Sequence, residues 1–141
     1  MIVLLDTDVL IDIALDRHPH AEYSSNALNL VQTGSIDAWL AWHSLSNFYY
    51  IVSSGGQHKK AVRFIEELLQ FVRVAETGTA DAIYAAKSGF SDFEDALQVA
   101  AAVSCNAQFI VTRNIKHYKK SPVPAILPEH LCRLINKPTL R

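Results

Sequence analysis

The amino-acid sequence predicts an α/β fold in three layers, with helices on both faces of a mostly parallel central sheet. Two apolar runs, residues 2–5 and residues 108–112, do not alternate with polar side chains, as is typical of strands buried on both faces. Between them, apolar residues recur at helical spacing, so predicted helices alternate with predicted strands. The 141 residues fit one domain, and we expect residues 1–141 to form a single globular unit.

The composition argues against several classes of protein. Half of the residues are hydrophobic, 19% are charged and the formal net charge is -1, so neither disorder nor a strongly basic overall surface is expected. Cys105 and Cys132 lack the spacing of a zinc site or a disulfide framework. The N-terminal apolar run is short and has no basic residue before it, which differs from a signal peptide. We expect a cytoplasmic protein without a membrane segment.

Helical periodicity predicts two helices early in the chain, over residues 9–14 and 21–31, separated at His18-Pro19. A short strand is expected over residues 38–42, and Ser44 or Ser46 is expected to cap the helix that follows. The remaining expected elements are a helix over 61–71, a strand over 73–76, a helix over 80–87 capped by Thr79, a strand over 108–112, a strand over 123–127 and a helix over 128–135.

The stretch FSDFEDALQVAAA, residues 90–102, places three acidic residues at the start of an almost wholly apolar helix. Ser91 is expected to be the N-cap of this helix. Glu94 stands three residues later, which is the spacing of a capping box. Asp92 and Asp95 then share one face near the N-terminus of the helix.

Ligands of open parallel sheets gather at the carboxyl ends of the strands, where this sequence has polar residues. Asp6 follows the first strand, and Asn114 follows the strand over 108–112. Together with Asp92 and Asp95, they make a set of oxygen donors. Such a set favours Mg²⁺ or Mn²⁺, because a divalent cation offsets the repulsion between carboxylates. A metal held there activates water for hydrolysis of a phosphodiester in nucleic acid.

A structural interpretation of the same acids is also available. Asp6 can cap the first helix, Asp92 and Glu94 can complement the helix dipole, and Asp8 and Asp12 can be solvated. The basic residues form two local clusters that either contact RNA phosphates or are simply solvated. Their candidate RNA-binding members are Lys59, Lys60, Arg63, Arg113 and Lys116.

Four motifs, in this order, resemble those of the PIN domain family, the fold of VapC-type toxin ribonucleases. They are LLDTDVLID, FSDFEDALQVAAA, FIVTRNIKHY and SPVPAILPEHL, and they cover nearly the whole chain. The resemblance implies a small α/β nuclease that binds Mg²⁺ or Mn²⁺, commonly forms a homodimer and is often encoded beside an antitoxin. It also implies that Asp6 is the first acid of the site and Asp95 the acid on the late helix, with Asp92 as a companion.

The sequence departs from the family pattern at three positions. Asn47 stands where the family usually has Glu on the helix after the second strand, and Asn114 and His117 stand where an Asp is usual. The site therefore holds less negative charge, and we expect weaker metal binding. Asp8 stands where Asn is usual and is a candidate to compensate, and Thr112 is a candidate to orient a ligand or water.

The leading hypothesis is a metal-dependent ribonuclease with Asp6 and Asp95 as principal ligands. Asp92, Asn47 and Asn114 would support the metal or its waters. A second hypothesis is a PIN-like module that binds RNA or protein without catalysis, because the acid set is reduced. A third is a phosphatase of the haloacid-dehalogenase type, since Asp6-Thr7-Asp8-Val9 also looks like the DxDx[TV] motif of those enzymes, with Asp6 as nucleophile.

Overall fold

The first strand of the chain lies in the middle of a five-stranded parallel sheet. In the computed structural model, which describes residues 1–137, β1 (Ile2–Leu5) pairs with β2 (Asp37–Leu40) on one side and β4 (Phe109–Val111) on the other. The edge strands β3 (Arg73–Val74) and β5 (Ala125–Ile126) complete the order β3-β2-β1-β4-β5. Val3, Leu4 and Leu5 are fully buried, which explains why the first apolar run does not alternate.

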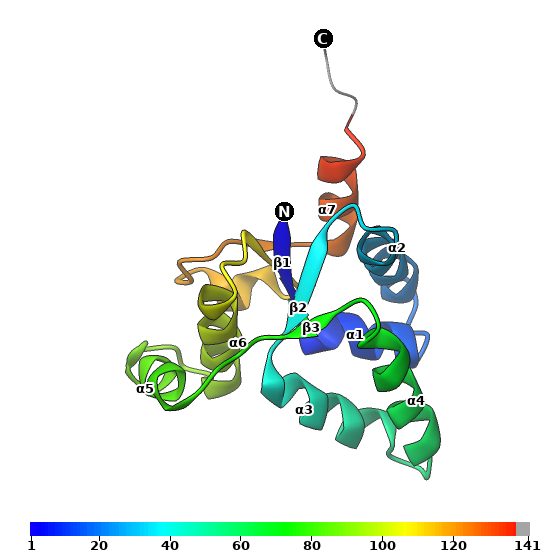
Figure 1. Ribbon diagram of the computed structural model, residues 1–141, viewed down its shortest axis with the longest axis horizontal. Helices are drawn as coiled ribbons and strands as arrows, with labels where there is room; N and C mark the ends of the chain where they lie inside the picture. Colours follow the sequence, from blue (N-terminus) through cyan, green and yellow to red (C-terminus); the bar gives the residue numbers. More distant parts are fainter. Residues whose placement is uncertain (138–141) are drawn as a thin grey trace.

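Helices cover both faces of this sheet and make the three layers (Figure 1). Their bounds are α1 (Thr7–Ala14), α2 (His20–Gln32), α3 (Trp42–Val52), α4 (His58–Leu68), α5 (Thr79–Lys87), α6 (Phe93–Ser104), the 3₁₀ helix η1 (Ile115–Tyr118) and α7 (Pro128–Ile135). α5 and α6 lie on one side of the sheet, and α1 to α4 with α7 lie on the other. The two sides enclose separate apolar clusters, one containing Val3 and Leu5 and the other containing Leu4 and Val99. The predicted fold class is confirmed.

The register of the sheet brings two predicted site segments together. Leu5 pairs with Val111, so the residues that follow β1 and β4 emerge side by side at the carboxyl ends of the strands. The backbone N–H of Asp6 donates to the carbonyl of Val111 at 2.9 Å and extends this pairing by one residue. The rule that ligands gather at this edge therefore applies to Asp6 and to the loop after β4.

The early part of the chain follows the expected pattern except at the start of α3. The break at His18-Pro19 is confirmed, because α1 ends at Ala14 and α2 begins at His20. The expected strand over 38–42 ends at Leu40, and Trp42 already belongs to α3. Neither Ser44 nor Ser46 caps this helix. The N-cap is Ala41, and the buried Ser44 hydroxyl bonds to side chains of other helices.

Two further cap predictions were wrong by one residue. Asp92, not Ser91, is the N-cap of α6, because its carboxylate accepts from the N–H of Asp95 at 3.2 Å. The capping box with Glu94 does not form, and the Glu94 carboxylate lies near Asn47 of α3, whose side chain acts to lower the pKa of Glu94. Gly78, not Thr79, precedes α5, and the Asp81 carboxylate accepts from its backbone N–H at 2.8 Å. In both cases a carboxylate, rather than the hydroxyl of the predicted cap, accepts a backbone N–H at the start of the helix.

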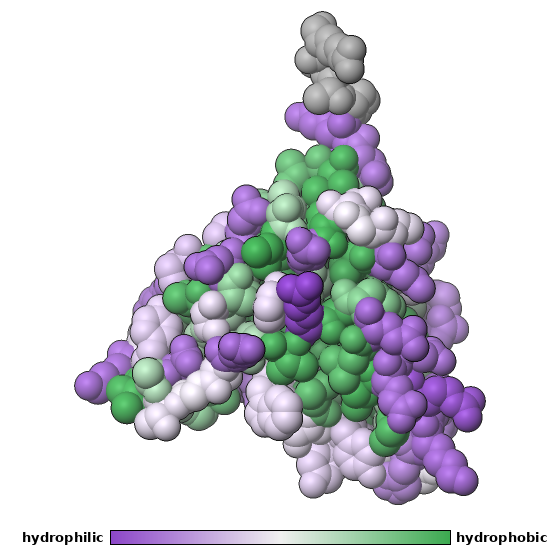
Figure 2. Space-filling view, in the orientation of Figure 1, coloured by the Kyte–Doolittle hydropathy of each residue, from purple (hydrophilic) through white to green (hydrophobic). Residues whose placement is uncertain are grey.

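Apolar and polar surface are distributed unevenly over the face shown in Figure 2. Hydrophobic side chains gather along α7 and down the middle of this face, whereas hydrophilic side chains cover the side of α4. Large exposed apolar residues also occur on α3, where Trp42 is 69% and Tyr50 is 72% exposed. Among the helices within residues 1–137, none combines the length and apolar character needed to span a bilayer.

Candidate active site

Asp6 is held at the end of β1 by three hydrogen bonds. Its Oδ1 accepts from the backbone N–H of Thr7 at 2.7 Å, so Asp6 is the N-cap of α1. Its Oδ2 accepts from the hydroxyls of Thr112 and Tyr118, each at 2.9 Å. The residue is only 8% exposed. Burial raises the pKa of Asp6, while the hydrogen bonds from Thr112 and Tyr118 act in the opposite direction. The carboxylate is thus fixed in one orientation before any ligand arrives.

Asp8 lies beside Asp6 and is tied to the loop after β4. Its Oδ2 accepts from the Asn114 amide at 2.7 Å and lies 3.4 Å from the Thr112 hydroxyl. Its Oδ1 is buried and has no hydrogen-bond partner in the described residues. Burial, followed by the negative charge of Asp6, raises the pKa of Asp8 to about 7. Asp8 therefore has an oxygen available to a cation or water that enters the site.

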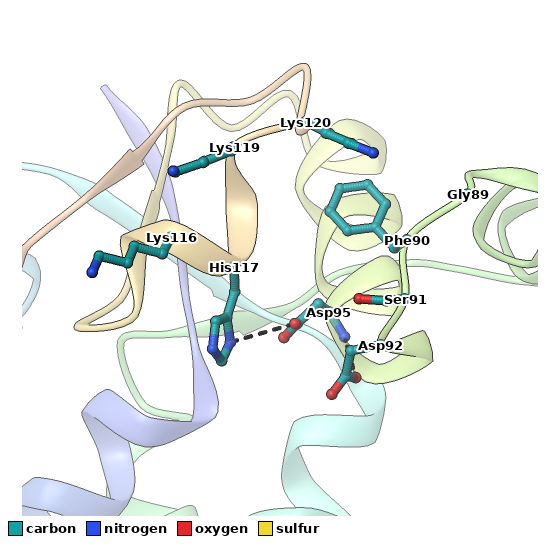
Figure 3. A pocket seen from close by; sticks show the side chains of 9 residues that line it. All are labelled: Gly89, Phe90, Ser91, Asp92, Asp95, Lys116, His117, Lys119 and Lys120. Carbon is teal, nitrogen blue, oxygen red and sulfur yellow. Dashed lines mark hydrogen bonds and ion pairs between the residues drawn. The ribbon is translucent and has the colours of Figure 1, made fainter.

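The acids of α6 face this pair from the other side of the sheet edge. Asp95 Oδ2 lies 3.4 Å from Nδ1 of His117 (Figure 3). Burial, followed by the charge of Asp92, raises the pKa of Asp95 to about 6. Burial, followed by the charge of Asp6, also raises the pKa of Glu94, while the nearby Asn47 side chain acts in the opposite direction. Because the charge of Asp6 acts on both α6 acids, the two groups form one electrostatic cluster.

This cluster has the chemistry of a divalent-cation site but not a complete cage. Within residues 1–137, no three or more His, Cys, Asp and Glu side chains are arranged closely enough to hold an ion by themselves. Mg²⁺ is usually bound by one or two carboxylates, several waters and the phosphates of a substrate. The all-oxygen donor set, the free Oδ1 of Asp8 and the raised pKa values of the carboxyl groups fit such an ion. Its positive charge would relieve the repulsion between them.

A buried cluster of polar side chains near Asp6 joins three helices, α1, α3 and α6. The Gln98 amide donates to the hydroxyls of Thr7 at 3.1 Å and Ser44 at 2.8 Å, and the Thr7 hydroxyl donates to Ser44 at 2.8 Å. All three residues are buried. Gln98 lies about one helical turn after Asp95, so these bonds position the start of α6 against β1.

An ion pair anchors the loop after β4 to α1. Arg113 Nε donates to Asp12 Oδ2 at 2.6 Å, and Arg113 Nη2 lies 3.4 Å from Asp12 Oδ1. Asp12 is fully buried rather than solvated, and Arg17 lies 3.8 Å away. The Arg113 guanidinium is thus occupied within the protein. It fixes the segment that carries Thr112 and Asn114.

The other candidate RNA-binding residues lie in two separate places. Lys116 is exposed on η1, next to His117 and the α6 acids. Lys59, Lys60 and Arg63 are exposed on α4, which lies on the opposite side of the sheet from α6. The structure thus brings Lys116, but not the α4 cluster, next to Asp95.

Sequence patterns missed several residues that support the site. Tyr118 holds Asp6, Gln98 and Thr7 join the helices, and Glu94 faces the cluster rather than capping its helix. Gln98 carried a weak signal, because it is a large polar residue within an apolar helix. Tyr118 carried none, since its hydroxyl is positioned by the 3₁₀ turn after β4.

Comparison with known proteins agrees with this architecture. A family model described as PIN domain matches residues 2–116. A curated relative, Ribonuclease VapC1 of Aquifex aeolicus (strain VF5), is 24% identical over an alignment of 139 residues that covers 95% of this chain and 95% of that one. A solved structure of VapBC2 from Rickettsia felis, bound to a DNA fragment from the promoter, has a TM-score of 0.69 at 20% identity and covers 90% of this chain and 98% of that one.

VapBC-1 from nontypeable Haemophilus influenzae has the same TM-score of 0.69 at 16% identity, covering 91% of this chain and 98% of that one. At such identities the likeness of the structures shows a common fold. The family model, however, spans most of the sequence and includes Asp6, Asp95 and Asn114. This chain therefore belongs to the PIN domain family.

Proposed function

We propose that this protein is a divalent-metal-dependent endoribonuclease. The observation that carries the proposal is the cluster of Asp6, Asp8, Glu94 and Asp95 at the carboxyl ends of the parallel strands. Each of these carboxyl groups has a raised pKa, so the site favours positive charge. The named activity of Ribonuclease VapC1, a relative over nearly the whole chain, supports RNA as the substrate.

Asp6 and Asp95 are the proposed ligands of Mg²⁺ or Mn²⁺, and Asp92, Asn47 and Asn114 support the ion or its waters. A bound ion would activate a water and offset the charge of the phosphodiester during in-line displacement. Thr112 and Tyr118 hold the Asp6 carboxylate, and Asn114 holds that of Asp8. These contacts place the carboxylates before substrate binds, so little reorganisation accompanies the reaction.

RNA phosphates are proposed to contact the exposed Lys116 next to this cluster. Lys59, Lys60 and Arg63 offer a second basic surface on α4, away from the acids. Arg113 is proposed to act indirectly, since its guanidinium holds Asp12 and leaves little of its charge for phosphate.

A homodimer and a complex with an antitoxin are also proposed. The VapBC structures that share this fold carry the names of two-component toxin–antitoxin complexes, which supports a protein partner for this chain. The exposed aromatic side chains of Trp42 and Tyr50 on α3 offer apolar contact area of the kind found in such interfaces.

Calorimetric titration with Mn²⁺ and an RNA cleavage assay test the enzyme directly. Asp6→Asn and Asp95→Asn should each weaken Mn²⁺ binding at least about tenfold and abolish measurable cleavage. Asp37→Asn is a matched control, because this exposed carboxylate lies at the amino end of β2, at the opposite edge of the sheet. The enzyme proposal fails if the wild type neither binds Mn²⁺ nor cuts RNA.

A PIN-like module that binds RNA or protein without cutting is the second candidate. It is favoured by the Asp6 carboxylate, whose two oxygens are already occupied by internal hydrogen bonds. The substitution Asn47→Glu distinguishes the nuclease from the binding module, because it adds a carboxylate beside Glu94. In a nuclease this substitution should strengthen Mn²⁺ binding and cleavage, whereas a binding module stays inactive. Phosphatase chemistry at Asp6 and Asp8 is not proposed for a member of the PIN domain family.

A further inference from the structure

A cavity of about 500 Å³ opens between the start of α6 and η1, next to Asp95. One wall is formed by the connection from α5 to α6, including Phe90 and Ser91, and the other by η1 and the residues just after it. His117 belongs to the η1 wall, and its ring points toward Asp95 of α6 (Figure 3). The volume suits a ligand of the size of one nucleotide.

The rim of this cavity is basic although the interior of the site is acidic. Lys116, Lys119 and Lys120 line it and are exposed. Among residues 1–137, none of these lysines lies within 4.0 Å of a carboxylate oxygen. Figure 3 shows Lys120 on the Phe90 side and Lys116 and Lys119 on the other side. The side chains of Lys116 and Lys119 extend outward from the η1 side in this view, so the three ammonium groups lie at the exposed rim and are free to contact anionic groups.

Phe90 supplies an aromatic wall whose position is fixed by packing. Its ring is partly buried and packs against two apolar clusters, one of them containing Ala96 and Ala100 of α6. The preceding Gly89 has φ of 80°, which a residue with a side chain adopts only with strain, and this turn directs Phe90 toward α6. Such a ring can stack with a base of any identity without first losing conformational freedom.

We propose that this cavity binds one unpaired nucleotide of the RNA, adjacent to the phosphate that lies over Asp6 and Asp95. The base stacks on Phe90, and the two flanking phosphates contact Lys120 on one side and Lys116 and Lys119 on the other. A base inside a duplex cannot reach the ring while it remains stacked, so the cavity selects single-stranded segments, loops or bulges. This inference rests on RNA being the substrate of the acidic site.

Equilibrium binding without divalent cations separates this inference from catalysis. Fluorescence anisotropy would compare a short single-stranded RNA of mixed sequence with the same sequence in a duplex, in the presence of a chelator. We expect the wild type to prefer the single strand. Phe90→Leu should weaken single-strand binding roughly 5- to 50-fold, whereas Phe90→Tyr, which keeps an aromatic ring, should bind as the wild type does. Thermal unfolding of both variants checks that the fold is retained.

The lysines are tested with a charge-matched pair of double variants. Lys119→Gln with Lys120→Gln should lower the slope of log affinity against log salt by about 1 to 2. Arg133→Gln with Lys137→Gln removes the same charge from exposed positions on α7 and just after it, on the opposite side of the sheet, and should change single-strand affinity less than about twofold. Equal losses from both pairs would overturn the inference, since the general field of the protein would then hold the RNA.

The two proposals fail in different ways. If Phe90→Leu and the Lys119 and Lys120 changes abolish single-strand preference while Mn²⁺ elicits no cleavage, the cavity assignment stands and the nuclease proposal is wrong. If the wild type cuts RNA and Phe90→Leu keeps both its affinity and its preference for unpaired RNA, the cavity assignment is wrong.

Discussion

Acidic residues are closely spaced in two places, after β1 and at the start of α6, but the two groups differ in burial and in hydrogen bonding. Asp6 and Asp12 are buried, and each accepts hydrogen bonds from side chains more than a hundred residues away. Asp92 and Glu94 are exposed, and Asp95 has one ion pair with an exposed histidine. The first group is part of the folded framework, whereas the second stands at the edge where solvent and ligands arrive.

This difference separates the energetic roles of the two groups. A change in a buried acid leaves its partners unsatisfied inside the protein, so it lowers stability and activity together. A change in an α6 acid removes charge from the site but leaves little unsatisfied. Substitutions in the two groups are thus expected to divide into those that unfold the protein and those that only inactivate it.

The largest effect is expected at Asp12. Asp12→Ala leaves Arg113 without its buried partner and should lower the free energy of unfolding by about 3–5 kcal/mol, as measured by urea denaturation. Glu66→Ala, an exposed acid of α4, is the control and should change it by less than about 0.5 kcal/mol. Similar losses in both variants would show that the Asp12 pair is not part of the framework.

Glu94→Gln should act on catalysis alone. It removes a carboxylate that is coupled to Asp6 while keeping a group able to bond with Asn47. We expect the rate of Mn²⁺-dependent RNA cleavage to fall roughly 100-fold, with no loss of unfolding free energy. Unchanged cleavage would show that the Glu94 carboxylate has no part in the reaction.

The pKa of Asp8, about 7, makes stability depend on pH in a defined direction. In the unfolded chain an Asp deprotonates near pH 4, so between about pH 4 and 7 the folded state holds the extra proton. Stability contributed by this group is therefore present at low pH and lost as the pH rises through 7. Raised pKa values of Asp6 and Asp95 act in the same direction.

In a chelator-containing buffer, we expect the free energy of unfolding to fall by about 2 kcal/mol between pH 5 and pH 8. Asp8→Asn should remove much of this decrease. Mn²⁺ should recover stability at pH 8 by binding the folded state. A stability that rises over this range in the wild type would contradict the assignment of buried, mutually repelling carboxyl groups.

The smallest effect on the free energy of unfolding is expected for the buried hydrogen bonds that connect α1 with α6. Ser44→Ala removes one member of the Thr7, Ser44 and Gln98 cluster and should cost about 1 kcal/mol of unfolding free energy. Ser46→Ala, on an exposed position of the same helix, should be within about 0.5 kcal/mol of the wild type. A larger cost at Ser46 than at Ser44 would exclude this cluster as the link.

The sequence predicted the framework better than the details of the site. β1 and β4 were predictable because strands buried on both faces need apolar side chains at every position. Asp6 and Asn114 were then placed together by the general rule for the carboxyl ends of parallel strands, and the register confirms this. Metal binding by Asp6 and Asp95 stays a prediction.

The helix caps and the hydrogen-bond partners were not predictable, because they depend on contacts distant in sequence. Ser44 has the residue type of a cap but bonds to Thr7 and Gln98, and Glu94 has the spacing of a capping box but lies near Asn47 of α3. Asp12 has the residue type of a solvated acid, yet it is buried and forms an ion pair with Arg113. Local patterns do not contain the partner that decides each of these cases.

The central position of β1 also determines when the hydrogen bonds that hold Asp6 can form during protein synthesis. β1 leaves the ribosome before the other strands of the sheet, and its partner β4 and the two hydroxyls that hold Asp6 are more than a hundred residues behind it. Pairing over such a separation closes a long loop and comes late in folding. During synthesis Asp6 can cap α1 early, but its second oxygen lacks the Tyr118 hydroxyl until that residue has emerged, and a translation product that stops before Thr112 carries Asp6 without either hydroxyl.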